Sequence, residues 1–194
     1  MRLLCPEETF EVVGRFGMQP AAANEAYGQT LLPLDPRSMD ELQRIEARAD
    51  LDCANVSALL LRIIGWGGFS GARLLWVSST FSVYPDVSRL YYGLLARFGD
   101  SQSLMDRQAI LFDGLGGDIY DVFADESIRE EVETLVSALS VILLGSWDAF
   151  LLSEASGSFV EFWEGNILFY TSRKDAASEA EAIIAEFELP AGMR

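Results

Sequence analysis

The spacing of apolar residues predicts several amphipathic helices, and residues 86–98 form the clearest of them. Their apolar side chains fall on one continuous stripe, and Gly99 follows as a residue typical of a helix end. The stripe consists of Val87, Leu90, Tyr91, Leu94, Leu95 and Phe98. We therefore expect a helix here with one buried face.

Two further helices are predicted in the second half of the chain. The longest covers residues 125–144; its first half carries acids, which suit the positive end of the helix dipole. Its second half is apolar on nearly every side and is expected to be buried. A last helix follows Ser172 and ends before Pro190. Its inward residues are expected to be Ala176, Ala180, Ile183, Ile184 and Phe187.

Two helices are also predicted before residue 70. Residues 38–41 match a capping box, in which Ser38 accepts a backbone amide and Glu41 reaches back toward the helix start. The helix that they begin would bury Leu42, Ile45 and Ala49. The second helix covers residues 53–64 and ends at Gly65, although a strand is the competing interpretation because the run is short and apolar.

Segments rich in β-branched and aromatic residues predict strands between the helices. The predicted strands are 74–83, 109–112, 118–123, 147–153, 158–163 and 167–171. Short turns join the last three, which favours an antiparallel meander. The sequence therefore predicts an α+β fold, with a mainly antiparallel sheet of about four to six strands and helices packed mostly on one face.

The 194 residues, half of them hydrophobic, supply enough apolar material for one sizeable core. We expect a single globular domain over residues 1–194, with a helical part over about 1–70 and an acidic α+β part over about 71–190. The start of the chain does not match a signal peptide, because two acids follow a very short apolar stretch. The longest uncharged run, between Glu133 and Asp148, is shorter than the roughly 20 residues of a spanning helix. We therefore expect a cytoplasmic protein without a membrane segment.

The chain contains no histidine, which excludes Ser-His-Asp and Cys-His nucleophilic systems and histidine-bearing zinc sites. Its two cysteines, Cys5 and Cys53, stand far apart and form no metal or redox spacing. We expect no catalytic residue, no metal and no cofactor. Any catalysis would have to use carboxylates, tyrosine, arginine or the single lysine, Lys174.

Negative charge is concentrated in the second half of this chain, whose net charge is −16. Residues 1–97 contain 11 acids and 9 bases, whereas residues 98–194 contain 19 acids and 5 bases. Such a field repels nucleic acid and anionic membranes and attracts basic protein surfaces.

The densest acidic segment, residues 113–133, is predicted to bind a basic partner. It contains eight acids and one base, Arg129. A metal site and a solvated acidic edge are the alternatives, although the spacing is not that of an EF-hand loop. An exposed tryptophan on the meander would add an interface anchor. The predicted partner-binding residues are Asp113, Asp118, Asp121, Asp125, Glu126, Glu130, Glu133 and Trp163.

Two other patterns resemble chemical sites but favour structural explanations. Residues 65–71 have the spacing G-x-G-x-x-x-G, which differs from the dinucleotide fingerprint, and a predicted strand follows instead of a helix. We therefore interpret them as a connection between a helix and a strand. Glu161 and Glu164 flank Trp163; Glu161 is expected to share a side with Trp163, and Glu164 to lie in a turn. Asp148 is expected to anchor a turn through backbone amides.

Three segments give the chain a resemblance to uncharacterised small bacterial proteins of the immunity-protein type, from polymorphic and contact-dependent toxin systems. They are residues 74–77 (LLWV), residues 85–98 and residues 145–152 (GSWDAFLL). The resemblance covers about the last 120 of the 194 residues, and no functional residue is carried over.

These observations predict a non-catalytic, acidic binding protein, with the resemblance pointing to an immunity-type inhibitor of a basic toxin enzyme. An enzyme with a carboxylate- or tyrosine-based site is the first alternative. An accessory or adaptor subunit, which would present an exposed apolar patch, is the second. We expect a basic protein partner, and neither nucleic acid nor membrane.

Overall fold

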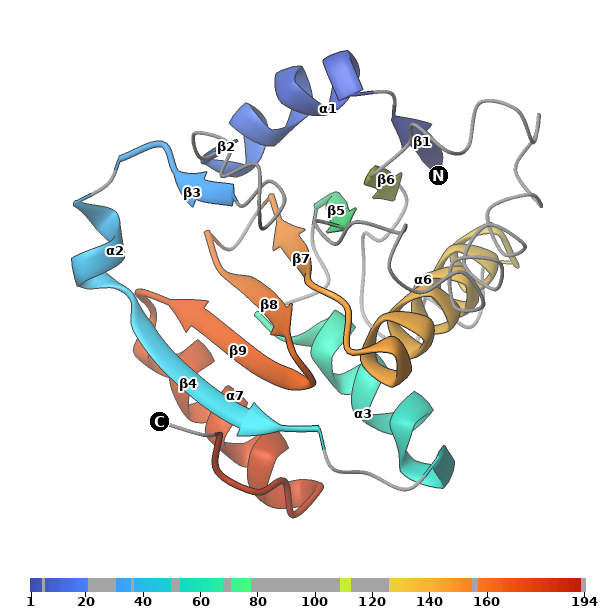
Figure 1. Cartoon of the computed structure of the whole chain (residues 1–194), viewed down its shortest axis with the longest axis vertical. Coiled ribbons are helices and arrows are strands. Elements are labelled where there is room, and N and C mark those ends of the chain that lie inside the picture. The colour runs from blue at the N-terminus through green and yellow to red at the C-terminus, as the bar shows by residue number, and fades with distance from the viewer. Residues whose placement is uncertain are drawn as a thin grey trace.

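The structure is a computed structural model, and it describes residues 1–4, 6–20, 31–35, 37–49, 53–67, 71–77, 109–112, 126–154 and 157–192 (Figure 1). The helices are α1 (Pro6–Val13), α2 (Ser38–Glu41), α3 (Cys53–Gly65), α6 (Glu126–Gly145) and α7 (Lys174–Glu186), with a 3₁₀ turn η1 (Gly14–Phe16). A small sheet contains β2 (Met18–Pro20) and β3 (Leu31–Pro33). The main sheet contains β1 (Arg2–Leu4), β4 (Gln43–Arg48), β5 (Arg73–Val77), β6 (Ala109–Phe112), β7 (Ala149–Ser153), β8 (Phe159–Trp163) and β9 (Asn166–Thr171).

The main sheet has seven strands in the order β1-β6-β5-β7-β8-β9-β4, and every neighbouring pair is antiparallel. The predicted α+β class is therefore confirmed. Strands β7, β8 and β9 form the predicted meander. Glu164 and Gly165 connect β8 to β9 with positive φ angles of 48° and 78°, as a two-residue hairpin turn requires.

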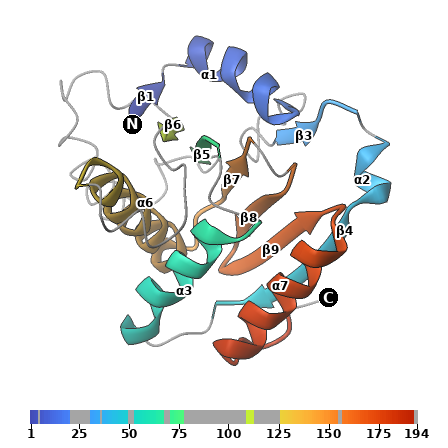
Figure 2. The same cartoon turned by 180° about the vertical axis from the view of Figure 1, so that it is seen from behind.

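Helices α3, α6 and α7 cover one face of the sheet, as Figure 2 shows from behind. Their inward residues and one set of strand residues form the larger core, which includes Leu59, Leu139 and Ile183. Helix α1 and the β2–β3 pair pack on part of the other face, over a smaller core that includes Trp76 and Phe150. The prediction that the helices pack mostly on one face is therefore confirmed. No helix of the described ranges combines the length and the apolarity needed to cross a membrane.

The prediction that a helix continues from Ser38 through Ala49 is wrong. Helix α2 stops at Glu41 after about one turn, and Gln43–Arg48 is strand β4, paired with all six residues of β9. Ser38 makes no side-chain cap and instead donates its hydroxyl to the carbonyl oxygen of Asp35 at 2.6 Å. The cause is the alternation from Arg44 to Ala47, in which charged and apolar residues point to opposite faces.

Strands β1 and β4 come from the first part of the chain and form the two edges of the sheet. They bring the number of strands to seven, above the predicted four to six, and they show that the part before residue 70 is not helical throughout. Sequence patterns did not reveal them because an edge strand gains stability from pairing with a distant partner, β9 in the case of β4.

The helices predicted at 53–64, 125–144 and after Ser172 are confirmed as α3, α6 and α7. One exception concerns the apolar second half of α6: Leu144 is 69% exposed instead of buried. Strand β6 matches its predicted segment, and β5 begins at Arg73, one residue before the predicted segment 74–83. The predicted helix at 86–98, the predicted strand at 118–123 and residues 78–83 lie outside the described residues.

Candidate functional site

Of the predicted partner-binding residues, Asp113, Asp118, Asp121 and Asp125 lie outside the described residues. Glu126, Glu130 and Glu133 lie exposed on α6, and the side chains of Glu126 and Glu133 are 91% and 73% accessible. Arg129 lies among them. Its Nη2 is 3.7 Å from Oε1 of Glu126, and its Nε is 4.0 Å from Oε1 of Glu133. We call Glu126, Glu130 and Glu133 the α6 acidic face.

Trp163 is exposed at the end of β8, as an interface anchor would be, but it does not join the α6 acidic face. It lies on the same side of β8 as Phe159, which belongs to the smaller core, whereas α6 packs over the other side. Glu133 is the residue of the α6 acidic face nearest to the end of α6 at Gly145. It lies 12 residues before that end, which is about 18 Å along a helix axis. The described members of the predicted site thus lie on two separate surfaces.

The face of the sheet that carries Trp163 also holds a cavity of about 190 Å³, which we call the sheet-face pocket. The register places its strand residues together, because Phe159 lies opposite Tyr170 and Phe150 lies opposite Glu161. In Figure 1 this face of β4, β9 and β8 is turned toward the viewer, with α7 behind it. The pocket is lined by Leu31, Leu32, Met39, Phe150, Phe159, Glu161 and Tyr170.

Glu161 and Tyr170 form the polar part of the sheet-face pocket. The Tyr170 hydroxyl donates a hydrogen bond of 2.9 Å to Oε2 of Glu161. The Tyr170 ring stacks on Phe159, with centroids 4.6 Å apart and planes at 13°. Sequence reasoning placed Glu161 correctly on the side of Trp163 but missed its partner, because only strand pairing brings residues 161 and 170 together.

Burial raises the pKa of the Glu161 carboxyl above its ordinary value, although the Tyr170 hydrogen bond and the positive charge of Arg44 oppose the rise. The negative charges of Asp148 and Glu46 add to it. Burial also raises the pKa of Tyr170, and Glu161 adds to that rise, so the phenol stays protonated and acts as a hydrogen-bond donor.

The edge strand β4 supplies an ion pair beside this site, with Arg44 Nη2 2.6 Å from Glu46 Oε2. The other oxygen of Glu46, Oε1, is buried and accepts no hydrogen bond from the described residues. Pro190 lies beside the end of β4, where its carbonyl accepts a hydrogen bond of 2.9 Å from the Arg48 amide. Gly192 lies so close that a Cβ there would overlap the Glu46 side chain, so any larger residue at this position would require Glu46 to move.

We expect Glu161→Gln to stabilise the protein at pH 7. Glutamine keeps an acceptor for Tyr170 and removes the half-buried charge. A carboxyl whose pKa is raised by folding binds its proton more tightly in the folded state, so its ionisation lowers stability as the pH rises above 4.5. The gain should therefore stay within about 1 kcal/mol at pH 7 and shrink as the pH falls below 4.5.

Urea unfolding of both proteins at several pH values measures this difference. The exposed Glu181→Gln on α7 serves as the control and should change stability little at any pH. A Glu161→Gln protein that is less stable at pH 7 than at pH 4, relative to wild type, would contradict the expectation.

Two smaller predictions about the meander are confirmed. Glu164 lies exposed in the hairpin turn, and its amide donates to Oδ1 of Asp148 at 3.4 Å, so Asp148 does contact a turn amide. Burial raises the pKa of Asp148, against this hydrogen bond, and the charge of Glu164 adds to the rise.

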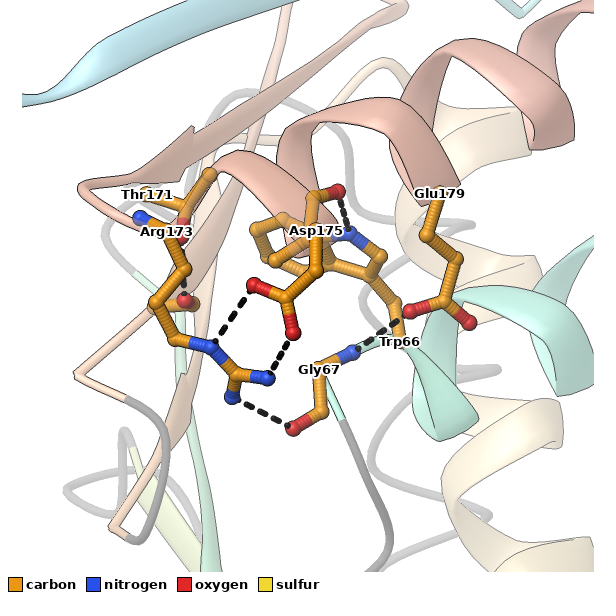
Figure 3. A network of polar contacts seen from close by, with 8 residues as sticks. Trp66, Gly67, Thr171, Arg173, Asp175 and Glu179 are labelled. Atoms are coloured by element: carbon orange, nitrogen blue, oxygen red, sulfur yellow. Dashed lines mark hydrogen bonds and ion pairs between the residues drawn. The ribbon is translucent and has the colours of Figure 1, made fainter.

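Trp66 and Gly67, which follow α3, form a structural joint with α7, as Figure 3 shows. The Trp66 indole donates to the Ala176 carbonyl at 2.8 Å. The Gly67 amide donates to Glu179 at 3.3 Å, and its carbonyl accepts from Arg173 at 3.4 Å. Because a carboxylate holds the Gly67 amide, that amide is not free to bind a phosphate. The segment connects α3 to β5, as predicted.

Within the described ranges, no group of three or more acidic, cysteine or histidine side chains is placed to hold a metal ion. Comparisons of the chain with models of protein families, with curated proteins and with solved structures find no match. Function must therefore be inferred from the chemistry of the residues.

Proposed function

We propose that this chain is a non-catalytic binding protein that uses the α6 acidic face to bind a basic protein. One observation carries the proposal: three carboxylates project from a helix whose opposite side is fixed in the core, with one arginine among them. A rigid helix holds the backbone of these residues at constant spacing, so little backbone conformational entropy is lost when a partner binds them.

The specific role proposed is that of an immunity-type inhibitor of a basic toxin enzyme. The net charge of −16 supports this role, because a strongly acidic inhibitor associates rapidly with a cationic enzyme through electrostatic steering. In that case the partner is toxic when expressed alone and harmless when this chain is co-expressed, and an unchanged toxicity would refute the inhibitor role.

We expect reversal of the α6 acidic face to weaken partner binding by about tenfold or more. The variant carries Glu126→Lys, Glu130→Lys and Glu133→Lys. Each reversal adds two charge units, so the net charge changes from −16 to −10. The measurement is capture of partners from the source cells, followed by determination of their affinity at low and high salt.

The matched control reverses three exposed acids on other helices and reaches the same net charge of −10. It carries Glu11→Lys, Asp40→Lys and Glu181→Lys. We expect it to keep most of the affinity, because only the position of the charges differs. Equal losses of affinity in both variants, or an affinity that does not change with ionic strength, would refute docking on the α6 acidic face.

An enzyme is the alternative, and the specific observation that favours it is the pairing of Glu161 with Tyr170 in the sheet-face pocket. Because the pKa of Tyr170 is raised, Glu161 is the candidate base of such a site and Tyr170 the donor. An adaptor role is supported by the exposed apolar side chains of Leu32, Leu34 and Met39.

A further inference from the structure

We propose that the sheet-face pocket binds a small organic ammonium ion, whose cationic group pairs with the Glu161 carboxylate and whose apolar body packs against Phe150, Phe159 and Tyr170. This binding site is distinct from the α6 acidic face and does not depend on it. The two surfaces lie on opposite sides of the sheet.

The size of the pocket sets the size of the ligand. An apolar protein cavity of about 150 Å³ holds a benzene molecule. The sheet-face pocket is partly open to solvent, and its volume of about 190 Å³ would suit one six-membered ring with a short substituent. Among the described lining residues only Glu161 and Tyr170 carry polar groups, so a ligand would place its own polar group beside them.

The charge of the pocket selects a cation. Tyr170 occupies only Oε2 of Glu161, and the carboxylate forms no ion pair with the described residues. Arg44 acts on Glu161 electrostatically, but its guanidinium is bonded to Glu46 at 2.6 Å. With Glu46 and Asp148 also negative nearby, an ammonium group would offset the cost of holding the half-buried Glu161 charge.

The aromatic residues favour an organic cation over a metal ion. The rings of Tyr170 and Phe159 stack nearly in parallel, and the ring centroids of Phe150 and Phe159 are 6.4 Å apart. Aromatic surface therefore borders the carboxylate. Aromatic faces attract ammonium groups and bury apolar bodies. Hard metal ions require several oxygen ligands, and Glu161 supplies the only carboxylate among the described lining residues.

Titration with benzylamine, monitored by NMR or calorimetry, tests the proposal. Benzyl alcohol is the neutral compound of the same shape, and n-butylamine is the cation without a ring. We expect saturable binding of benzylamine, at least about tenfold tighter than that of either other compound. The perturbed NMR signals should centre on Phe159 and Tyr170.

Two variants identify the carboxylate that binds the cation. Glu161→Gln should weaken benzylamine binding by about tenfold or more and leave benzyl alcohol unaffected. Glu164→Gln removes the same charge three residues away, from an exposed turn, and should bind benzylamine like the wild type. Because Glu161→Gln keeps the acceptor for Tyr170, its fold should persist, which a thermal unfolding curve checks.

Three results would overturn the proposal: no saturable binding of benzylamine, equal binding of benzyl alcohol, or equal losses in both variants. If n-butylamine bound as tightly as benzylamine, the proposed packing of a ring against the aromatic residues would be overturned. That result would point to an alkylammonium group such as a lysine side chain. None of these results bears on the charge reversals of α6, so the two proposals fail or stand separately.

Discussion

Replacement of Trp66 with alanine is expected to lower the free energy of unfolding by about 3–5 kcal/mol. The indole is buried at the end of α3 and meets the ring of Phe169 edge-on, with centroids 5.0 Å apart. Its Nε1 also donates to the Ala176 carbonyl at the start of α7. One side chain therefore joins α3, β9 and α7, and its removal leaves a cavity where all three meet.

The substitution Trp66→Phe separates packing from hydrogen bonding. Phenylalanine keeps an aromatic ring against Phe169 and loses the indole donor, so we expect a smaller loss of about 1–2 kcal/mol. Urea unfolding with unchanged m-values would measure both effects. A loss below about 1 kcal/mol for Trp66→Ala would contradict the role of this joint.

Leu139→Ala is expected to cost about 2–5 kcal/mol, whereas Leu144→Ala should stay within about 0.5 kcal/mol of wild type. Both leucines lie on α6, but Leu139 is fully buried in the larger core and Leu144 is 69% exposed. Because both substitutions exchange the same residues in one helix, differences in helix propensity largely cancel.

The same unfolding measurement compares the two leucine variants. A large loss at Leu144 would mean that the outward side of α6 is covered in solution, for example by another copy of the chain. A small loss at Leu139 would contradict the packing of α6 against α3 and the sheet. The pair therefore tests which face of α6 presents the acidic residues to solvent.

Local patterns were sufficient to predict the long helices and the meander. In α3 and α7, apolar residues repeat with helical spacing over at least three turns, and each helix buries that stripe. In the meander, short polar turns separate strongly apolar runs, so antiparallel pairing follows from turn length alone.

Local patterns failed where a segment's conformation depends on a distant partner. The residues after Ser38 carry both a helix-start signal and a short alternation, and pairing with β9 decided in favour of the strand. The candidate sites behaved alike: the exposure of Glu126, Glu130 and Glu133 follows from helix periodicity, but the pairing of Glu161 with Tyr170 depends on the register between β8 and β9.

By itself, the sequence determined the fold class, the excess of acids and the absence of histidine, since each follows from residue types and their local spacing. Only the tertiary structure decided which strands form the edges of the sheet, that Trp163 lies away from the α6 acidic face, and that Glu161 lines a pocket. The physical reason is the same in each case. Strand register and layer packing bring together residues far apart in the sequence, and no local pattern encodes that proximity.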